Sequence, residues 1–331
     1  MIAGEEARWV RSEPRRELAA AMLERIVQAA FPRRRAVAIE PLAGGLRNSN
    51  FKLHLDSAPH VAVLRIYEHD ASLCRKEIDL MRLVGGSVPV PEVLHAEPLG
   101  FEDVPPFILM RYVEGVSFLQ LKRAGDQEAI AQAAFSAGEV LAGIGRFTFP
   151  RAGWLAPGPL VTWPLLEGAD PAPRFADLCL ASPNFARRAL AELRDRVHAL
   201  MWSWAGPCAR LTEETCLVHG DFNRRNLLVR SVAGRWSVAA VVDWEFAVSG
   251  SPMADCGNFL RYERASQPWA EPHFSTGFVQ AGGVLPPDWR GLARVIDLTA
   301  VCESLTHSHL SETVVAELIE ILRCVVEDLR P

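Results

Sequence analysis

The sequence predicts an α+β protein with two lobes, a small β-rich lobe followed by a larger, mainly helical lobe. Two observations support this prediction. The chain has 331 residues, which exceeds the length of one average domain. Strand-like runs dominate before about residue 117, and amphipathic helical patterns dominate after it. We therefore expect an N-terminal lobe of residues 1–113, with a helix within residues 1–34, and a C-terminal lobe of residues 114–331.

The N-terminal lobe begins with a helical pattern, because residues 14–31 place apolar side chains on one face. Residues 36–68 read as three short strands, in which apolar runs are separated by turns rich in glycine or proline. Residues 72–84 predict a helix that paired glycines end, and residues 106–115 predict an apolar strand. This order of elements predicts a small lobe built from a sheet and helices.

The C-terminal lobe shows mostly helical patterns. Amphipathic patterns occur at residues 126–147, 184–204, 289–305 and 312–329. Between them, six prolines within residues 148–173 predict an irregular insertion. The strand-like runs of this half are residues 216–219, 226–230 and 236–244, which predict a short central hairpin.

Composition excludes several classes of protein. The chain is 49% hydrophobic and 23% charged, which is typical of a soluble globular protein with a large core. Its net charge of −5 indicates neither a nucleic-acid nor a membrane partner. Seven scattered cysteines without a C-x-x-C pair argue against a disulfide framework or a zinc site. Because the chain also lacks a long apolar run and a signal-peptide pattern, we expect a cytoplasmic protein.

Two polar interruptions of apolar runs carry the candidate chemistry. In CLVHGDFNRRNLLV, Asp221 and Asn226 stand between two hydrophobic flanks, and AAVVDWEF ends a strand at Asp243. Most polar loops are only surface turns. A hairpin between the two strands would, however, bring Asp221, Asn226 and Asp243 together. Phosphoryl transfer requires such a trio, with a carboxylate to orient and deprotonate an alcohol, and an amide and a carboxylate to hold magnesium.

These motifs resemble those of the aminoglycoside phosphotransferase/choline kinase-like family of small-molecule kinases, whose fold is similar to that of protein kinases. The resemblance spans residues 36–329. It implies ATP and Mg²⁺ as cofactors, Asp221 as the catalytic base, and Asn226 and Asp243 as catalytic magnesium ligands. Glu245 would contact magnesium directly or through a neighbouring ligand. Around these residues, His219 and Gly220 would shape the loop, and Asp255 would brace its backbone.

The resemblance also gives the first lobe a role in nucleotide binding. Residues 42–54 look like the hairpin that covers the phosphates, and Arg65 stands where kinases usually carry a lysine. Arginine keeps the positive charge, so the role can survive the change. Glu77 would pair with Arg65; the less favoured alternatives are that Arg65 is a solvated charge and Glu77 a surface acid. The implied nucleotide-binding residues are Gly44, Gly45, Asn48, Ser49, Val63, Arg65, Glu77, Met110, Arg111 and Val113, with adenine meeting the backbones of the last two.

The acceptor is a small molecule with a hydroxyl group that the sequence does not identify. An aminoglycoside, a choline-like amine, homoserine, a sugar or a hydroxyacyl thioester all remain open, as does the oligomeric state. Acids and aromatic residues in 260–290 would suit a cationic acceptor, but core aromatics and surface acids are the favoured explanation of them. They are Tyr262, Glu263, Trp269, Glu271, Asp288 and Trp289. A nucleotide-binding regulatory protein without catalysis is the alternative function.

Overall fold

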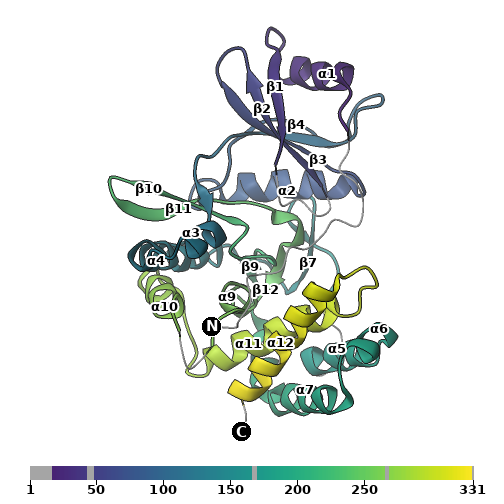
Figure 1. Ribbon diagram of the computed structural model, residues 1–331, viewed down its shortest axis with the longest axis vertical. Helices are drawn as coiled ribbons and strands as arrows, with labels where there is room; N and C mark the ends of the chain where they lie inside the picture. The colour runs from purple at the N-terminus through teal and green to yellow at the C-terminus, as the bar shows by residue number, and fades with distance from the viewer. Residues whose placement is uncertain (1–16, 43–47, 166–169, 265–267, 330–331) are drawn as a thin grey trace.

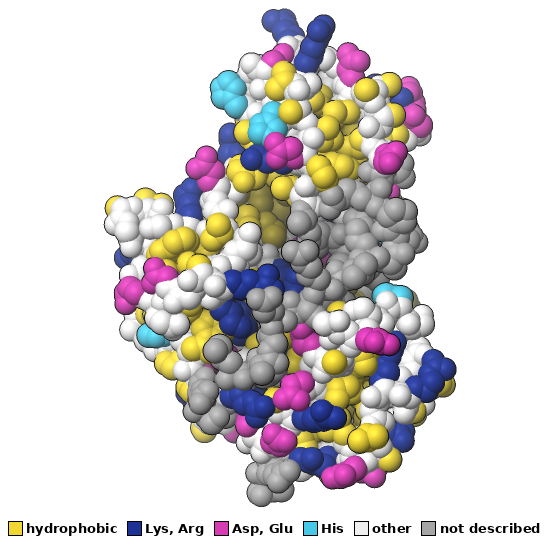
Figure 2. Space-filling view, in the orientation of Figure 1, with side chains coloured by type: hydrophobic (Ala, Val, Ile, Leu, Met, Phe, Trp, Pro, Cys, Tyr) yellow, Lys and Arg dark blue, Asp and Glu magenta, His cyan; other side chains and the backbone are white. Residues whose placement is uncertain are grey.

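A computed structural model describes residues 17–42, 48–165, 170–264 and 268–329 of the chain. Figure 1 shows a β-rich lobe at the top and a larger, mainly helical lobe below it. The predicted α+β architecture is therefore confirmed. On the face shown in Figure 2, the surface is hollowed between the two lobes, and hydrophobic side chains line part of the hollow. Among the described residues, no helix has the length and apolar character needed to cross a lipid bilayer.

The upper lobe is a five-stranded antiparallel sheet in the order β1-β2-β3-β5-β4. One face of the sheet packs against α1, and the other face looks toward α2 and the lower lobe. Strand β5 shows the alternation directly, since Phe107 and Leu109 join one hydrophobic cluster while Ile108 and Met110 join the other. The elements are α1 (Ala20–Ala30), β1 (Ala36–Pro41), β2 (Ser49–Leu55), β3 (Val61–Ile66), α2 (Ala71–Val84), β4 (Val93–Glu97) and β5 (Phe107–Arg111).

The lower lobe places helices around two small antiparallel sheets, in the orders β11-β10-β6 and β8-β7-β12-β9. Its strands are β6 (Val116–Ser117), β7 (Gly153–Ala156), β8 (Leu160–Val161), β9 (Cys216–Val218), β10 (Leu227–Val232), β11 (Arg235–Val241) and β12 (Val248–Gly250). Its α-helices are α3 (Phe118–Ala124), α4 (Gln127–Ile144), α5 (Pro171–Leu180), α6 (Pro183–Arg188), α7 (Ala191–Ser203), α8 (Ala205–Ala209), α9 (Met253–Leu260), α10 (Glu271–Gln280), α11 (Trp289–Ser304) and α12 (Glu312–Asp328). The 3₁₀ turns are η1 (Arg210–Glu213) and η2 (Trp244–Phe246).

Three predictions for the lower lobe need correction. Residues 148–173 are not wholly irregular, because they contain the paired strands β7 and β8 and the start of α5. The helical pattern at 184–204 forms two helices, α6 and α7, because the backbone of Ala189 is extended between them. Strand β9 pairs with β12 rather than with the β10–β11 hairpin. The predicted hairpin itself is present, with Leu227 opposite Val241.

Strand β11 is the edge of its sheet, and helix α4 satisfies its outward backbone groups. Ser136 Oγ accepts a hydrogen bond from Val238 N at 3.1 Å, and Gln132 Oε1 accepts one from Trp236 N at 2.9 Å. Residues 132 and 136 lie one turn apart on the same face of α4, so their spacing matches alternate residues of the strand. The helix therefore covers an edge that would otherwise expose unpaired donors.

We predict that Ser136→Ala destabilises the protein by about 1–3 kcal/mol, because the buried Val238 N–H loses its partner. Urea unfolding followed by circular dichroism measures this change. Ser304→Ala is the matched control, since that hydroxyl bonds only to Ala300 O of its own helix. The control is expected to change the free energy of unfolding by less than about 0.5 kcal/mol. Equal stabilities of the two variants would contradict the prediction.

Candidate active site

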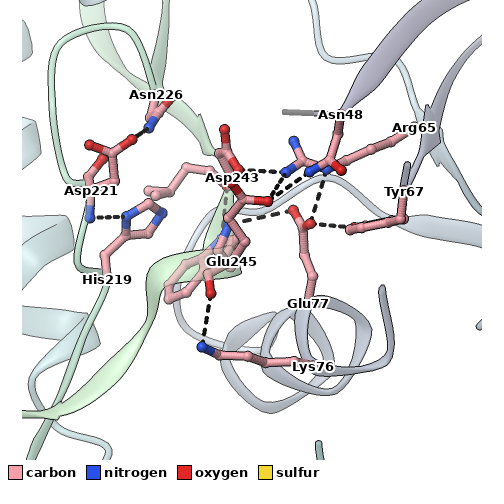
Figure 3. A network of polar contacts seen from close by, with 12 residues as sticks. Asn48, Arg65, Tyr67, Lys76, Glu77, His219, Asp221, Asn226, Asp243 and Glu245 are labelled. Atoms are coloured by element: carbon pink, nitrogen blue, oxygen red, sulfur yellow. Dashed lines mark hydrogen bonds and ion pairs between the residues drawn. The ribbon is translucent and has the colours of Figure 1, made fainter. Parts of the chain in front are cut away.

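The β10–β11 hairpin brings the two polar motifs together. Asn226 immediately precedes β10, and Asp243 follows β11 by two residues. Antiparallel pairing places the start of one strand beside the end of the other, and Val242 N donates to Asn226 O at 3.0 Å. The expected convergence of Asn226 and Asp243 is thus a consequence of hairpin register. Figure 3 shows Asp221 and Asn226 on one side of Asp243, with Arg65 and Glu77 on the other.

The backbone of the loop that carries Asp221 is held by Asp255 from α9. The Asp255 carboxylate accepts hydrogen bonds from His219 N at 2.7 Å and from Gly220 N at 3.0 Å. Burial raises the pKa of Asp255 to about 7, while these two donors oppose that shift. The predicted contact between Asp255 and the loop backbone is therefore present. It fixes the loop to the helical lobe.

His219 is a buried neutral residue of the loop. Burial lowers its pKa to about 4, so its Nδ1 can accept the hydrogen bond from Asp221 N at 3.2 Å. Its ring also lies 4.6 Å from the ring of Trp244, in an edge-to-face contact. The histidine thus packs the loop against the turn that follows Asp243, as a structural rather than a reacting group.

Both oxygens of the Asp221 carboxylate are oriented by amides. Asn223 Nδ2 donates to Oδ1 at 2.6 Å, and Asn226 Nδ2 donates to Oδ2 at 2.7 Å. Burial and the charge of Asp243 raise the pKa of Asp221 to about 6, against the opposing charge of Arg261 and the two amides. At neutral pH the group is mainly ionised and has the basicity that a general base needs.

Arg65 is buried and binds three carboxylates. Its Nε lies 3.1 Å from Glu77 Oε2, and one terminal nitrogen lies 2.5 Å from Asp243 Oδ1 and 3.4 Å from Glu245 Oε2. Although burial opposes the charged form, the charges of Asp243 and Glu77 outweigh it and raise the pKa of Arg65 well above its usual value. Neither open alternative holds, because Arg65 is 5% exposed and Glu77 is 1% exposed. The expected ion pair between them is present.

Helix α2 contacts the turn after Asp243 through neighbouring side chains. Glu77 Oε1 accepts from Trp244 N at 3.4 Å, and Lys76 Nζ donates to Glu245 O at 2.8 Å. Tyr67 Oη donates to the other oxygen of Glu77, Oε2. Burial lowers the pKa of Lys76 to about 8 and raises that of Glu77. The turn is thereby tied to the β-rich lobe (Figure 3).

Three residues offer oxygen donors of the kind that Mg²⁺ prefers, namely Asn226, Asp243 and Glu245. The amide nitrogen of Asn226 is committed to Asp221, so its Oδ1 remains for a cation. Burial and the charge of Asp243 raise the pKa of Glu245, which shows that the two carboxylates repel one another despite Arg65. A divalent cation would relieve that repulsion, so the donor set fits magnesium. Asp243 also has a positive φ of 72°, an uncommon conformation that clusters at functional turns.

The expected nucleotide-binding residues are placed in part. Asn48 and Ser49 are buried at the start of β2, and Asn48 Nδ2 donates to Glu245 Oε2 at 2.7 Å. Val63 lies opposite Met110 in the sheet. Arg111 N donates to Glu92 O at 2.8 Å, so this N–H is already committed within the lobe. Val113 lies two residues after the end of β5, whereas Gly44 and Gly45 lie outside the described residues.

Sequence reasoning missed three residues of this network, Asn223, Lys76 and Tyr67. A signal existed for two of them. Asn223 lies two residues after Asp221, a spacing at which an Asn side chain bonds locally, and Lys76 is adjacent to Glu77. Lys76 is also one of only three lysines among 35 basic residues. Tyr67 follows β3 and carried no motif, so its contact with Glu77 is visible only in three dimensions.

Comparison with known proteins gives a family and a fold. A model of the phosphotransferase enzyme family matches residues 38–295. No curated protein matches the chain. One similar solved structure is a thermostable mutant of aminoglycoside phosphotransferase APH(4)-Ia with ADP and hygromycin B. It has a TM-score of 0.66 at 18% identity and covers 93% of this chain and 99% of its own.

Two further solved structures resemble the chain to the same degree. A second mutant of that enzyme, with AMP-PNP and hygromycin B, has a TM-score of 0.66 at 20% identity and covers 92% of this chain and 98% of its own. The GDP complex of wild-type aminoglycoside 2'-phosphotransferase-IIIa has a TM-score of 0.65 at 17% identity. It covers 92% of this chain and 97% of its own. These likenesses confirm the predicted fold.

We predict that Gly220→Ala disrupts the loop that carries Asp221. Gly220 has a φ of +79°, and a methyl group there would lie 2.3 Å from Phe246 O. Gly125→Ala is the matched control, because Gly125 has the same φ of +79° with no atom within 4 Å of the added carbon. The control isolates the backbone strain of about 1–2 kcal/mol. Gly220→Ala is expected to cost at least about 1 kcal/mol more, in the range of overpacking. Thermal unfolding of both variants checks this, and equal losses would contradict it.

Proposed function

The chain belongs to the phosphotransferase enzyme family and is an enzyme that transfers phosphoryl groups, and we propose that it moves the γ-phosphate of ATP to a hydroxyl of a small molecule in a magnesium-dependent reaction. The observation that carries this proposal is the convergence of Asp221, Asn226 and Asp243 between the two lobes. Phosphoryl transfer needs little covalent chemistry from the protein, so positioned charges and donors of this kind are sufficient.

Asp221 is the catalytic base in this proposal. The acceptor hydroxyl donates a hydrogen bond to its carboxylate, which orients the oxygen and takes its proton as the bond to phosphorus forms. The amides of Asn223 and Asn226 hold the carboxylate in one rotamer, so it does not have to be ordered during the reaction. Each carboxylate oxygen has a second lone pair, so the amide hydrogen bonds leave room for the acceptor.

Asn226, Asp243 and Glu245 would hold magnesium, and Arg65 would lie beside them. Magnesium, when bound, neutralises charge on the phosphates. Arg65 already touches Asp243 and Glu245, so its guanidinium is positioned to face phosphate oxygens as well as the carboxylates. Asn48, Ser49, Val63, Met110, the Arg111 carbonyl and Val113 would line the nucleotide site.

The aromatic and acidic residues of 260–290 do not form an open site for a cationic acceptor. The guanidinium of Arg224 lies 4.6 Å from the Trp269 ring and 5.3 Å from the Tyr262 ring, and Lys122 Nζ lies 5.0 Å from Trp269. Arg290 likewise lies over Trp289. These rings already interact with cations of the chain itself, which weakens the case for a cationic acceptor at these side chains.

The acids of the same region also have partners within the fold. Glu263 accepts hydrogen bonds from Trp269, Ala270 and Glu271 at the start of α10. Glu271 pairs with Arg290 at 2.8 Å, and Asp288 pairs with Arg210 at 2.6 Å. We therefore leave the acceptor as a small molecule with a hydroxyl group, and the test below covers each class.

The alternative of a regulatory protein without catalysis rested on Arg65. That residue keeps its ion pair with Glu77, and Asp221, Asn226 and Asp243 are all in place, so catalysis has the stronger support. We also propose a cytoplasmic enzyme, because the seven scattered cysteines of the sequence form no disulfide framework or C-x-x-C pair.

We predict that Asp221→Asn lowers turnover by about 10²–10⁴-fold while nucleotide still binds, because the amide cannot accept the hydroxyl proton. The measurement is magnesium-dependent release of ADP across amino sugars, choline-like amines, homoserine, simple sugars and hydroxyacyl thioesters, with GTP as a second donor. Binding of ADP by calorimetry separates catalysis from nucleotide affinity. The control is Asp195→Asn, which removes an exposed carboxylate from α7 and should leave both readouts unchanged. Undiminished turnover in Asp221→Asn would refute the mechanism.

A further inference from the structure

Lys76 is a buried lysine whose partner is a backbone carbonyl. It lies on α2, between the sheet of the upper lobe and the lower lobe (Figure 1), and it is 5% exposed. Its Nζ donates to Glu245 O at 2.8 Å. Burying an amine is costly unless it is well hydrogen-bonded, and an apolar side chain of the same length would avoid that cost. The ammonium group therefore needs an explanation beyond packing.

The contact of Lys76 forms one half of a two-point attachment. Lys76 and Glu77 are consecutive on α2, and they bind the consecutive residues Trp244 and Glu245. One contact uses the Trp244 N–H and the other uses the Glu245 carbonyl, so both hold the backbone rather than side chains. The turn is thus held at the peptide groups on either side of the Trp244–Glu245 peptide, which restricts its rotation.

This turn lies between the two carboxylates proposed to hold magnesium, Asp243 and Glu245. The Glu245 side chain is itself held by Asn48 at 2.7 Å and lies near Arg65. Its backbone is held from the other side by Lys76 (Figure 3). The direction in which Glu245 and Asp243 present their oxygens therefore depends on α2.

We propose that Lys76 is a positioning residue that orients the Asp243–Trp244–Glu245 turn for magnesium and so couples the placement of α2 to metal binding. This inference rests on the proposed function, because it assumes that the turn holds magnesium. It does not require a particular charge state, since a lysine nitrogen donates hydrogen bonds in both of its forms. It assigns Lys76 no contact with the nucleotide or the acceptor.

The test compares Lys76→Met with the unaltered protein by titrating ADP calorimetrically without Mg²⁺ and then at increasing Mg²⁺. Methionine keeps the length and volume of the side chain but removes the donor. We expect the affinity of Lys76→Met for ADP without metal to stay within about twofold of the unaltered protein. The Mg²⁺ concentration that gives half of the metal-dependent gain in ADP affinity should rise about tenfold. A tenfold rise corresponds to the loss of one hydrogen bond of about 1.4 kcal/mol. Lys76→Arg, which keeps a donor, should lie between the two.

The matched control is Arg82→Met, which removes a cation from the exposed side of the same helix. It should leave the magnesium dependence unchanged. An unaltered magnesium dependence in Lys76→Met would overturn the inference. So would a loss of ADP affinity that is as large without Mg²⁺ as with it, because such a loss indicates general damage to packing. Equal behaviour of Lys76→Arg and Lys76→Met would also overturn it. If the unaltered protein itself binds ADP without any effect of Mg²⁺, the metal site of the proposed function fails, which is a distinct result.

Discussion

The active site depends on one buried cation, the guanidinium of Arg65. Glu77, Asp243 and Glu245 all direct carboxylate oxygens toward it, at 2.5–3.4 Å. Without it, the buried Glu77 and Glu245 and the half-buried Asp243 would face one another, and burial already raises the pKa of Glu77 and of Glu245. The planar fork reaches Glu77 through Nε and Asp243 through a terminal nitrogen, whereas a lysine nitrogen is a single point. Arginine at this position therefore joins β3, α2 and the turn after β11 into one unit.

The two polar motifs of the proposed site have different sets of contacts. Asp255 of α9 holds the backbone of the Asp221 loop within the helical lobe. The turn at Asp243 is held mainly from the other side, by Arg65 of β3 and Glu77 of α2. The edge contact between His219 and Trp244 connects the two parts. The proposed general base is thus held within the helical lobe, whereas the proposed metal-binding turn, which follows β11 of the same lobe, is bonded to the β-rich lobe as well.

Sequence patterns predicted the positions of the residues proposed for the reaction better than the positions of the elements around them, for a physical reason. Asp221, Asn226 and Asp243 are brought together by one hairpin, whose register follows from local strand and turn signals. Arg65 and Glu77 were found through the family resemblance, and their contact is long-range but follows from the fold. The break at Ala189 and the pairing of β9 with β12 depend on packing that no short window contains. The role of the aromatic residues of 260–290 was ambiguous in the sequence, because the side-chain cations that contact them, Lys122 and Arg224, come from distant segments.

The residues proposed for the reaction also differ in their contacts from the residues first suggested for acceptor binding. The residues proposed for phosphoryl transfer lie on the loop before β10, the turn after β11, strand β3 and helix α2. Most of them bond to each other, so a change in any one disturbs the others. The region first suggested for acceptor binding is instead tied up by the fold: Glu263 caps α10, and Arg224 lies over Trp269. Such contacts stabilise the fold. The residues proposed for the reaction are thus coupled to one another, whereas acceptor recognition can change without altering them.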